Sequence, residues 1–241
     1  MLTHIDEHSA RFAAAPFFAF LRDPTIDPRQ KLAFAPDVTH YVLTFADICR
    51  YLLPVHPPAD PWQEMVNANA EEDADHWEWF LSDLGTLGLD PTVRLSDAVR
   101  RLWSERALRT RMLSYRLAHY AIALDSLGRL TLVHCFESAF KVTIAAIRHA
   151  AAEFTAATGK PLLFLGGSHV EAEESHTIDE ADLRRRLAPV TLPSDARAKL
   201  LAMVDDAYGL FTDFAAEMHD LARSAALVPS SAAALEQRRA G

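Results

Sequence analysis

Two histidines and an acid late in the chain have the spacing of metal ligands. His169, Glu173 and His176 are four and three residues apart, so an α-helix places them at i, i+4 and i+7 on one face. Two imidazoles and a carboxylate on one face form half of a nitrogen–oxygen metal site, as used by iron, manganese or zinc. The alternative is a solvated, acid-rich helix face that carries two histidines by chance.

The residues before this motif predict where its helix begins. Ser168 with Glu171 three residues later matches a capping box, and Gly166 and Gly167 before it allow a sharp turn into the helix. Because capping gives Glu171 a structural role, Glu173 is the preferred ligand between the two histidines.

A second group of candidate ligands surrounds His76. Asp73 lies three residues before this histidine and Glu72 lies four before it. Asn69 lies seven before it, so a helix over residues 61–84 places all three on the face of His76. Any of them can join His76 on a metal ion. The alternative is a charged surface face whose aromatic neighbours turn inward.

A third candidate, Glu137, lies in a largely apolar helix expected over residues 130–158. A buried carboxylate needs a partner, because an unpaired buried charge is costly. In one hypothesis Glu137 is a metal ligand and catalytic residue that can bridge two ions, with Lys141 or His134 beside it or in the substrate pocket. In the other, Glu137 and Lys141 form a structural ion pair.

The elements that must position these residues are predicted to be helices. Half of the 241 residues are hydrophobic and only eight are glycine, which favours an all-α fold. We expect a single-domain bundle of about seven to eight helices over residues 1–228, with a flexible tail over residues 229–241. Helices are expected at residues 5–21 (kinked or divided at Pro16), 37–53, 61–84, 97–127 (with Ser96 as N-cap), 130–158 (after a break at residues 125–128) and 194–226.

Composition excludes several classes of function. A formal net charge of −9 argues against nucleic acid as a partner, because phosphate binding requires a basic patch. Cys49 and Cys135 are isolated, so neither a disulfide framework nor a thiolate metal site is expected. No secretory signal or membrane span is apparent, and we expect a cytoplasmic protein that acts on a small molecule and that can form a homodimer.

An arginine-rich segment suggests how a substrate is held. Residues 97–127 contain several arginines, most of which should be solvated or paired with acids elsewhere. An arginine that faces a pocket can bind a substrate carboxylate through two parallel hydrogen bonds. Together with Lys141, this segment favours an amino-acid-like substrate.

Three separate helices therefore offer ligands to one site. Facing helices of a bundle that carry carboxylates and histidines are how diiron and dimanganese sites are built. Five or six ligands suit two metal ions better than one, whereas a structural zinc ion needs only four.

At this point the sequence resembles the haem-oxygenase-like diiron oxidases and oxygenases, which share their fold with thiaminase-like and pyrroloquinoline-quinone-synthase proteins. The family pattern is an acid and a histidine on one helix, then a lone Glu, then His-x-x-x-acid-x-x-His. Here His76, Glu137 and the motif at His169 follow that order with similar separations, over roughly residues 5–225. The chain departs from the pattern at Asn69, where many members have an acid, and at Glu173, where Asp is common.

The resemblance implies a fold, a cofactor and an activity. It implies a haem-oxygenase-like bundle that binds two Fe(II) ions per chain and activates dioxygen as co-substrate. Reactions of the family include N-oxygenation, oxidative C–C cleavage, desaturation and nitrile formation, on amino acids, fatty acids or natural-product precursors. The implied metal ligands are His76, Glu137, His169, Glu173 and His176, with Asp73 or Glu72 completing the set.

Two other functions compete with this expectation. A metal-free enzyme of the same fold, similar to thiamin-degrading or cofactor-synthesising relatives, would use Glu137 as its acid and base and would bind no stoichiometric iron. A non-catalytic helical binding protein would keep its acidic helices as solvated faces, and loss of His169 or Glu137 would change its stability only modestly.

Overall fold

Every regular element in the described part of the chain is a helix, as the composition predicted. The computed structural model describes residues 1–167, 169 and 180–225. Its α-helices are α1 (Leu2–Ala13), α2 (Pro16–Arg22), α3 (Pro28–Lys31), α4 (Thr39–Asp47), α5 (Pro61–Asp73), α6 (Trp77–Leu87), α7 (Leu95–Leu102), α8 (Leu108–Ala123), α9 (Ser126–Thr158), α11 (Glu180–Leu187) and α12 (Ser194–Ser224). Two 3-10 helices, η1 (Ala35–Val38) and η3 (Glu105–Ala107), and a π-helical stretch, η2 (Ile48–Leu52), link them.

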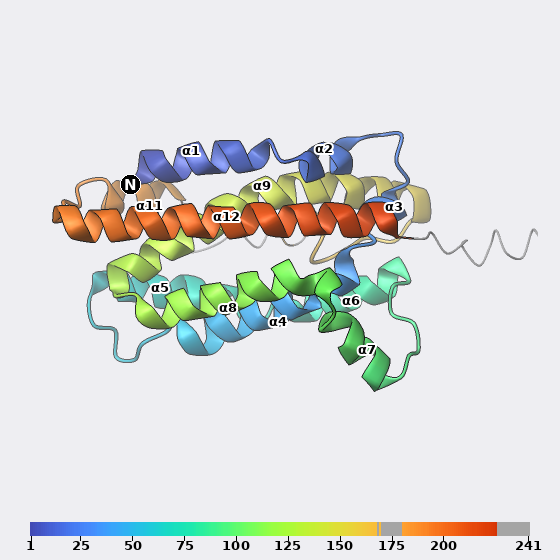
Figure 1. Cartoon of the computed structure of the whole chain (residues 1–241), viewed down its shortest axis with the longest axis horizontal. Helices are drawn as coiled ribbons and strands as arrows, with labels where there is room; N and C mark the ends of the chain where they lie inside the picture. The colour runs from blue at the N-terminus through green and yellow to red at the C-terminus, as the bar shows by residue number, and fades with distance from the viewer. Residues whose placement is uncertain (168, 170–179, 226–241) are drawn as a thin grey trace, which may run out of the picture.

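The long helix α9 is the centre of the bundle. It packs against α1, α2, α5 and α12. Figure 1 shows α1, α2 and α12 in one layer and α4, α5 and α8 in the other. By length and composition α9 alone among the described helices is apolar enough to cross a membrane, but 61% of its most apolar window is buried inside the protein. Burial on much of its circumference explains its apolar sequence as that of a core helix.

Capping residues set the ends of α9. The Asp125 side chain accepts a hydrogen bond from the backbone N–H of Gly128 over 2.8 Å, which satisfies a free donor of the first turn. Gly159 ends the helix in the left-handed conformation, with φ of 72°, which favours glycine. The Asp125–Gly128 stretch, expected to be a break before the helix, is therefore its first turn.

Several predicted boundaries are confirmed and others are wrong. Pro16 divides the first segment as expected, because it starts α2 at the position where a missing N–H costs nothing. Residues 97–127, expected to form one helical region capped by Ser96, form α7, η3 and α8 instead, and Arg94 occupies the N-cap of α7.

The expected helix over residues 61–84 is also divided. Asp60 caps α5 by accepting a hydrogen bond from Gln63, and α5 ends at Asp73. A turn over residues 74–76 follows, with a backbone bond from His76 to the carbonyl of Asp73 at 3.4 Å. Four acids crowd this part of the chain, and like charges four residues apart weaken a helix. The turn places His76 between two helices rather than on one continuous face.

Candidate metal centre

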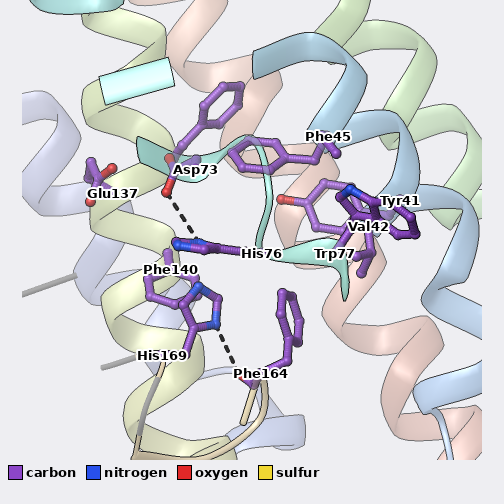
Figure 2. A pocket seen from close by; sticks show the side chains of 12 residues that line it. Tyr41, Val42, Phe45, Asp73, His76, Trp77, Glu137, Phe140, Phe164 and His169 are labelled. Atoms are coloured by element: carbon purple, nitrogen blue, oxygen red, sulfur yellow. Dashed lines mark hydrogen bonds and ion pairs between the residues drawn. The ribbon is translucent and has the colours of Figure 1, made fainter. Parts of the chain in front are cut away.

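A cavity between α4, the α5–α6 turn, α9 and the segment that follows α9 contains four of the predicted ligands. Asp73, His76, Glu137 and His169 all line it. Figure 2 shows the His76 ring between Asp73 and His169, with Glu137 facing the cavity from α9. Most of the remaining lining is aromatic or aliphatic, so the four polar side chains converge in apolar surroundings.

Asp73 and His76 are brought together by the turn between α5 and α6. Asp73 Oδ1 lies 3.6 Å from His76 Nδ1, and both side chains are largely buried. The His76 ring stacks on Trp79, with 4.7 Å between ring centroids and 17° between planes. The carboxylate and the stacked indole therefore fix the position of the imidazole.

Glu137 is oriented by Asn69, the residue at which the chain departs from the family pattern. The Asn69 side-chain amide donates a hydrogen bond to Glu137 Oε1 over 2.9 Å. Asn69 is buried and lies on α5, whereas Glu137 lies on α9, so the bond joins two packed helices. An amide nitrogen only donates, and it therefore supports the ionised carboxylate that a metal ion requires.

His169 is held by the backbone that precedes it. Its N–H donates to the carbonyl of Leu163 over 3.2 Å, and its ring Nδ1 lies 2.8 Å from the carbonyl oxygen of Phe164. A carbonyl oxygen only accepts, so Nδ1 is the donor of this hydrogen bond and Nε2 is the ring nitrogen that a metal ion would bind. This arrangement is typical of metal-binding histidines, whose second nitrogen is usually held by a carbonyl or carboxylate.

Asp83 on α6 fixes the segment that presents His169, and the sequence analysis missed it. Its two carboxylate oxygens accept hydrogen bonds from the backbone N–H groups of Leu163 at 2.7 Å and Leu165 at 2.8 Å. Burial raises the pKa of Asp83, and the backbone hydrogen bonds partly offset that rise. The signal was present, because an acid in the apolar stretch of α6 needs a partner just as Glu137 does.

A close backbone approach at Gly166 shapes the same segment. A Cβ atom on Gly166 would lie 2.0 Å from the carbonyl oxygen of Leu162, whereas one on Gly167 would meet nothing within 4 Å. The two glycines were predicted to allow a sharp turn. Of these two positions, Gly166 alone lacks room for a side chain, and neither has a positive φ.

The structure places the other predicted residues elsewhere. Glu72 is partly buried on α5, Lys141 is exposed on α9 and His134 is buried in α9, and none of them is part of the cavity wall. Glu173 and His176 lie outside the described residues, as does the expected Ser168–Glu171 capping box.

The arginines expected to receive a substrate carboxylate are engaged elsewhere. Arg101 forms two hydrogen bonds to buried Asp37 at 2.8 and 2.7 Å, and Arg116 pairs with Asp206 at 3.0 Å. Buried Arg111 donates to backbone carbonyls at the start of α8. In the part of the chain that the structure describes, no lysine or arginine lines the cavity.

A second, more apolar cavity adjoins the first. The two share five lining residues: Tyr41, Val42, Phe136, Phe140 and Phe164. Beyond this shared wall the second cavity is lined mainly by aliphatic and aromatic side chains of α1, α9 and α12, with Thr143 among them. Phe12, a buried core residue of α1, thus also lines a cavity.

Tyr41 contributes a polar group to the shared wall. Burial raises its pKa well above the ordinary tyrosine value, so the phenol stays protonated at neutral pH. Its ring packs against Phe214 with 5.0 Å between centroids. The hydroxyl thus remains a donor as well as an acceptor beside the four predicted ligands.

Comparison with solved structures establishes the class of fold. The chain is similar to a domain of unknown function with a haem-oxygenase-like fold from Shewanella denitrificans, with 16% identity and a TM-score of 0.58. The similarity covers 94% of this chain and 96% of that one. No family model and no curated protein matches the sequence. The protein is therefore an all-α protein with the haem-oxygenase-like fold, as the resemblance implied.

Proposed function

We propose that this protein is a non-haem iron oxidase or oxygenase that uses dioxygen to oxidise a small substrate. The observation that carries the proposal is that Asp73, His76, Glu137 and His169 line one largely apolar cavity. The rings of His76 and His169 lie 4.7 Å apart, and the Phe164 carbonyl holds His169 through Nδ1, as is usual for a histidine that binds metal through Nε2. A solvated helix face, the alternative, has no reason to gather these four side chains.

The donor set fits iron. Two imidazoles and two carboxylates are nitrogen and oxygen ligands, and no cysteine is among the described residues of the cavity wall. Asp73, His76, Glu137 and His169 would hold the first ion. A second ion would also require Glu173 and His176, which the resemblance implies as ligands. Bound iron(II) would supply the electrons that reduce dioxygen and the oxidising power that acts on the substrate.

The chain's own residues prepare the site for that chemistry. Asn69 orients Glu137 and favours its ionised form, and Trp79 fixes the His76 ring from one side. The apolar wall excludes water from the reacting groups, which limits side reactions. The protonated Tyr41 hydroxyl is placed to donate a hydrogen bond to a polar group of the substrate.

The cavities favour a substrate with an apolar body. The second cavity shares a wall with the metal-ligand cavity and is lined mainly by hydrocarbon and aromatic side chains. An amino-acid-like substrate was preferred from the sequence because Lys141 and the arginine-rich segment seemed able to bind its carboxylate. Those residues lie outside the described cavity walls, so we propose a substrate whose polar end meets the ligands and whose apolar end enters the second cavity.

Anaerobic reconstitution with Fe(II) tests the proposal. Wild-type protein is expected to bind about two irons per chain, the number that suits such ligand sets. Glu137→Ala and His169→Ala should lose most of the iron. Two exposed residues supply matched controls that should keep the iron: Glu78→Ala on α6 for the carboxylate and His149→Ala on α9 for the imidazole.

The reaction with oxygen separates the alternatives. When the reconstituted wild type is exposed to oxygen, oxygen should be consumed and the optical spectrum of the protein should change. Both effects should be absent in Glu137→Ala. If wild type binds no more iron than that variant, the iron proposal fails. Glu137 then becomes the acid and base of a metal-free enzyme of the same fold.

A further inference from the structure

A second cluster of metal-binding side chains lies on the other side of α9 from the proposed iron site, between α1 and α12. His4 and His8 stand one turn apart on α1, and Asp205 faces them from α12. Asp205 Oδ1 lies 2.6 Å from His4 Nε2 and 2.7 Å from His8 Nε2. The three potential ligand atoms all lie within 4.8 Å of one another, and none of these residues lines either cavity described above.

We propose that His4, His8 and Asp205 bind a divalent transition-metal ion of the zinc type, which ties the first helix to the last. Two imidazoles and one carboxylate are a donor set that zinc takes in open sites, with water as the fourth ligand. Histidines at i and i+4 lie on one helix face, so both rings reach the same ion. Among the described residues this is a cluster whose ligand atoms already converge on one point.

The geometry requires only a small adjustment to admit the ion. Zinc bonds of about 2.0–2.2 Å in a tetrahedral arrangement separate neighbouring ligand atoms by roughly 3.3 Å. The present separations between Asp205 Oδ1 and the two ring nitrogens are shorter by less than 1 Å, so the side chains need only move slightly apart. The Asp205 side chain is 56% exposed, which leaves it free to move and gives solvent access to the fourth position.

Packing around the histidines already limits their motion. The His8 ring stacks on Tyr208 with 5.3 Å between centroids, and the His4 ring meets that of His8 edge-on at 4.7 Å. Tyr208 is almost fully buried one turn after Asp205 on α12. Because the rings are held before an ion arrives, binding costs less side-chain entropy than it would on a loose surface.

Zinc titration of the full chain tests the site apart from the iron centre. The protein carries Glu137→Ala and His169→Ala, which remove ligands of the proposed iron site, and is stripped with a chelator first. We expect one zinc ion per chain in a competition titration with a chromophoric chelator. Replacement of His8 by Gln should weaken that binding about tenfold or more, the range found when a metal site loses a supporting contact. His149→Gln is the matched control.

The choice of Gln separates metal binding from a hydrogen-bonded contact. A Gln side chain can still donate to Asp205 but is a poor zinc ligand, so His4→Gln and His8→Gln should fold and yet show no rise in thermal unfolding temperature with zinc. The parent should show that rise, and the His149→Gln control should match it. The proposal would be overturned if the parent bound no zinc. It would also be overturned if zinc affinity were unchanged in His4→Gln, His8→Gln and Asp205→Asn.

Discussion

His169 donates its Nδ1–H to the carbonyl oxygen of Phe164 over 2.8 Å, and Phe164 lines both cavities. One residue therefore orients a predicted metal ligand through its backbone and forms part of both cavity walls through its side chain. Any change in the backbone of residues 162–166 should affect the predicted ligand and the cavity walls together.

Gly166→Ala should weaken iron binding, whereas Gly167→Ala should not. A Cβ at position 166 would press on the Leu162 carbonyl at 2.0 Å, and the backbone leading to His169 must move to relieve it. Position 167 has open space around its Cβ. We expect at least about tenfold weaker iron binding for the first variant, as for loss of other contacts that position ligands. Equal binding by the two variants would show that this approach does not position the ligand.

Asp83→Ala should loosen the same segment from the opposite side. The variant leaves the N–H groups of Leu163 and Leu165 without their carboxylate acceptor in a buried place, at a cost of about 1–3 kcal/mol in stability. Iron binding should fall with it, because His169 is presented by this segment. Chemical unfolding and iron titration measure the two effects, with Asp90→Ala, an exposed acid beyond the end of α6, as control. Normal stability in Asp83→Ala would contradict the role assigned to Asp83 as the acceptor that holds this segment.

Ile147→Trp should change which substrates are oxidised without changing iron content. Ile147 lines the second cavity only, so a larger side chain there shortens the space for an apolar body while leaving the ligands untouched. Turnover of long-chain substrates should drop more than turnover of short ones. The exposed Ile122→Trp on α8 controls for a general effect of the added ring. If both variants show the same preference as wild type, the second cavity does not hold substrate.

Glu217→Ala should destabilise the fold away from the site. This buried carboxylate of α12 accepts hydrogen bonds from the N–H groups of Arg109 and Thr110 and from the Thr110 hydroxyl, at 2.8, 2.9 and 2.6 Å. It therefore caps the first turn of α8 from another helix. Loss of the acceptor should lower the free energy of unfolding by about 1–3 kcal/mol. The exposed Asp213→Ala on α12 should be nearly neutral in the same denaturant titration.

The ion pair between Asp6 and Arg184 should stabilise the protein at neutral pH and lose that effect in acid. Arg184 donates two hydrogen bonds of 2.7 Å to Asp6, and this contact lowers the pKa of Asp6 despite its partial burial. A lowered pKa in the folded state gives stability that is present above the unfolded pKa. It is lost as the pH falls through the folded value.

The contribution of this pair should be small, because both side chains are partly exposed. Asp6→Asn should cost about 0.2–1 kcal/mol at pH 7. The difference from wild type should shrink towards pH 3, where Asp6 of the wild type is itself being protonated. Urea titrations at the two pH values measure it. A difference that grew in acid would contradict the assigned direction of the pKa shift.

Sequence patterns were sufficient for the fold class because helical periodicity and composition act locally. The apolar run of α9 predicted a buried core helix, and Pro16 predicted the division between α1 and α2. The boundaries that failed depend on tertiary contacts. Arg94 rather than Ser96 starts α7, and the acidic stretch after Asn69 does not continue as one helix.

The site was predictable where side-chain types alone gave the signal. His76, Asp73, Glu137 and His169 line one cavity, although they come from three distant parts of the sequence. Sequence alone did not show that Lys141 and Glu72 lie outside the cavity wall, because one turn of helix decides which face a side chain occupies. Nor could it show which groups Asp83 binds, because its partners are backbone groups 80 and 82 residues away.

The turn over residues 74–76 gives the chain a design constraint of its own. Replacing the acid of this turn with a better helix former would strengthen helix formation across it and join α5 to α6. In such a joined helix the side chain of His76 would point in a different direction, because each residue of an α-helix turns the chain by roughly 100°. A more regular and more stable variant should therefore bind metal less well. Selection for stability and selection for metal binding would then act in opposite directions on residues 74–76.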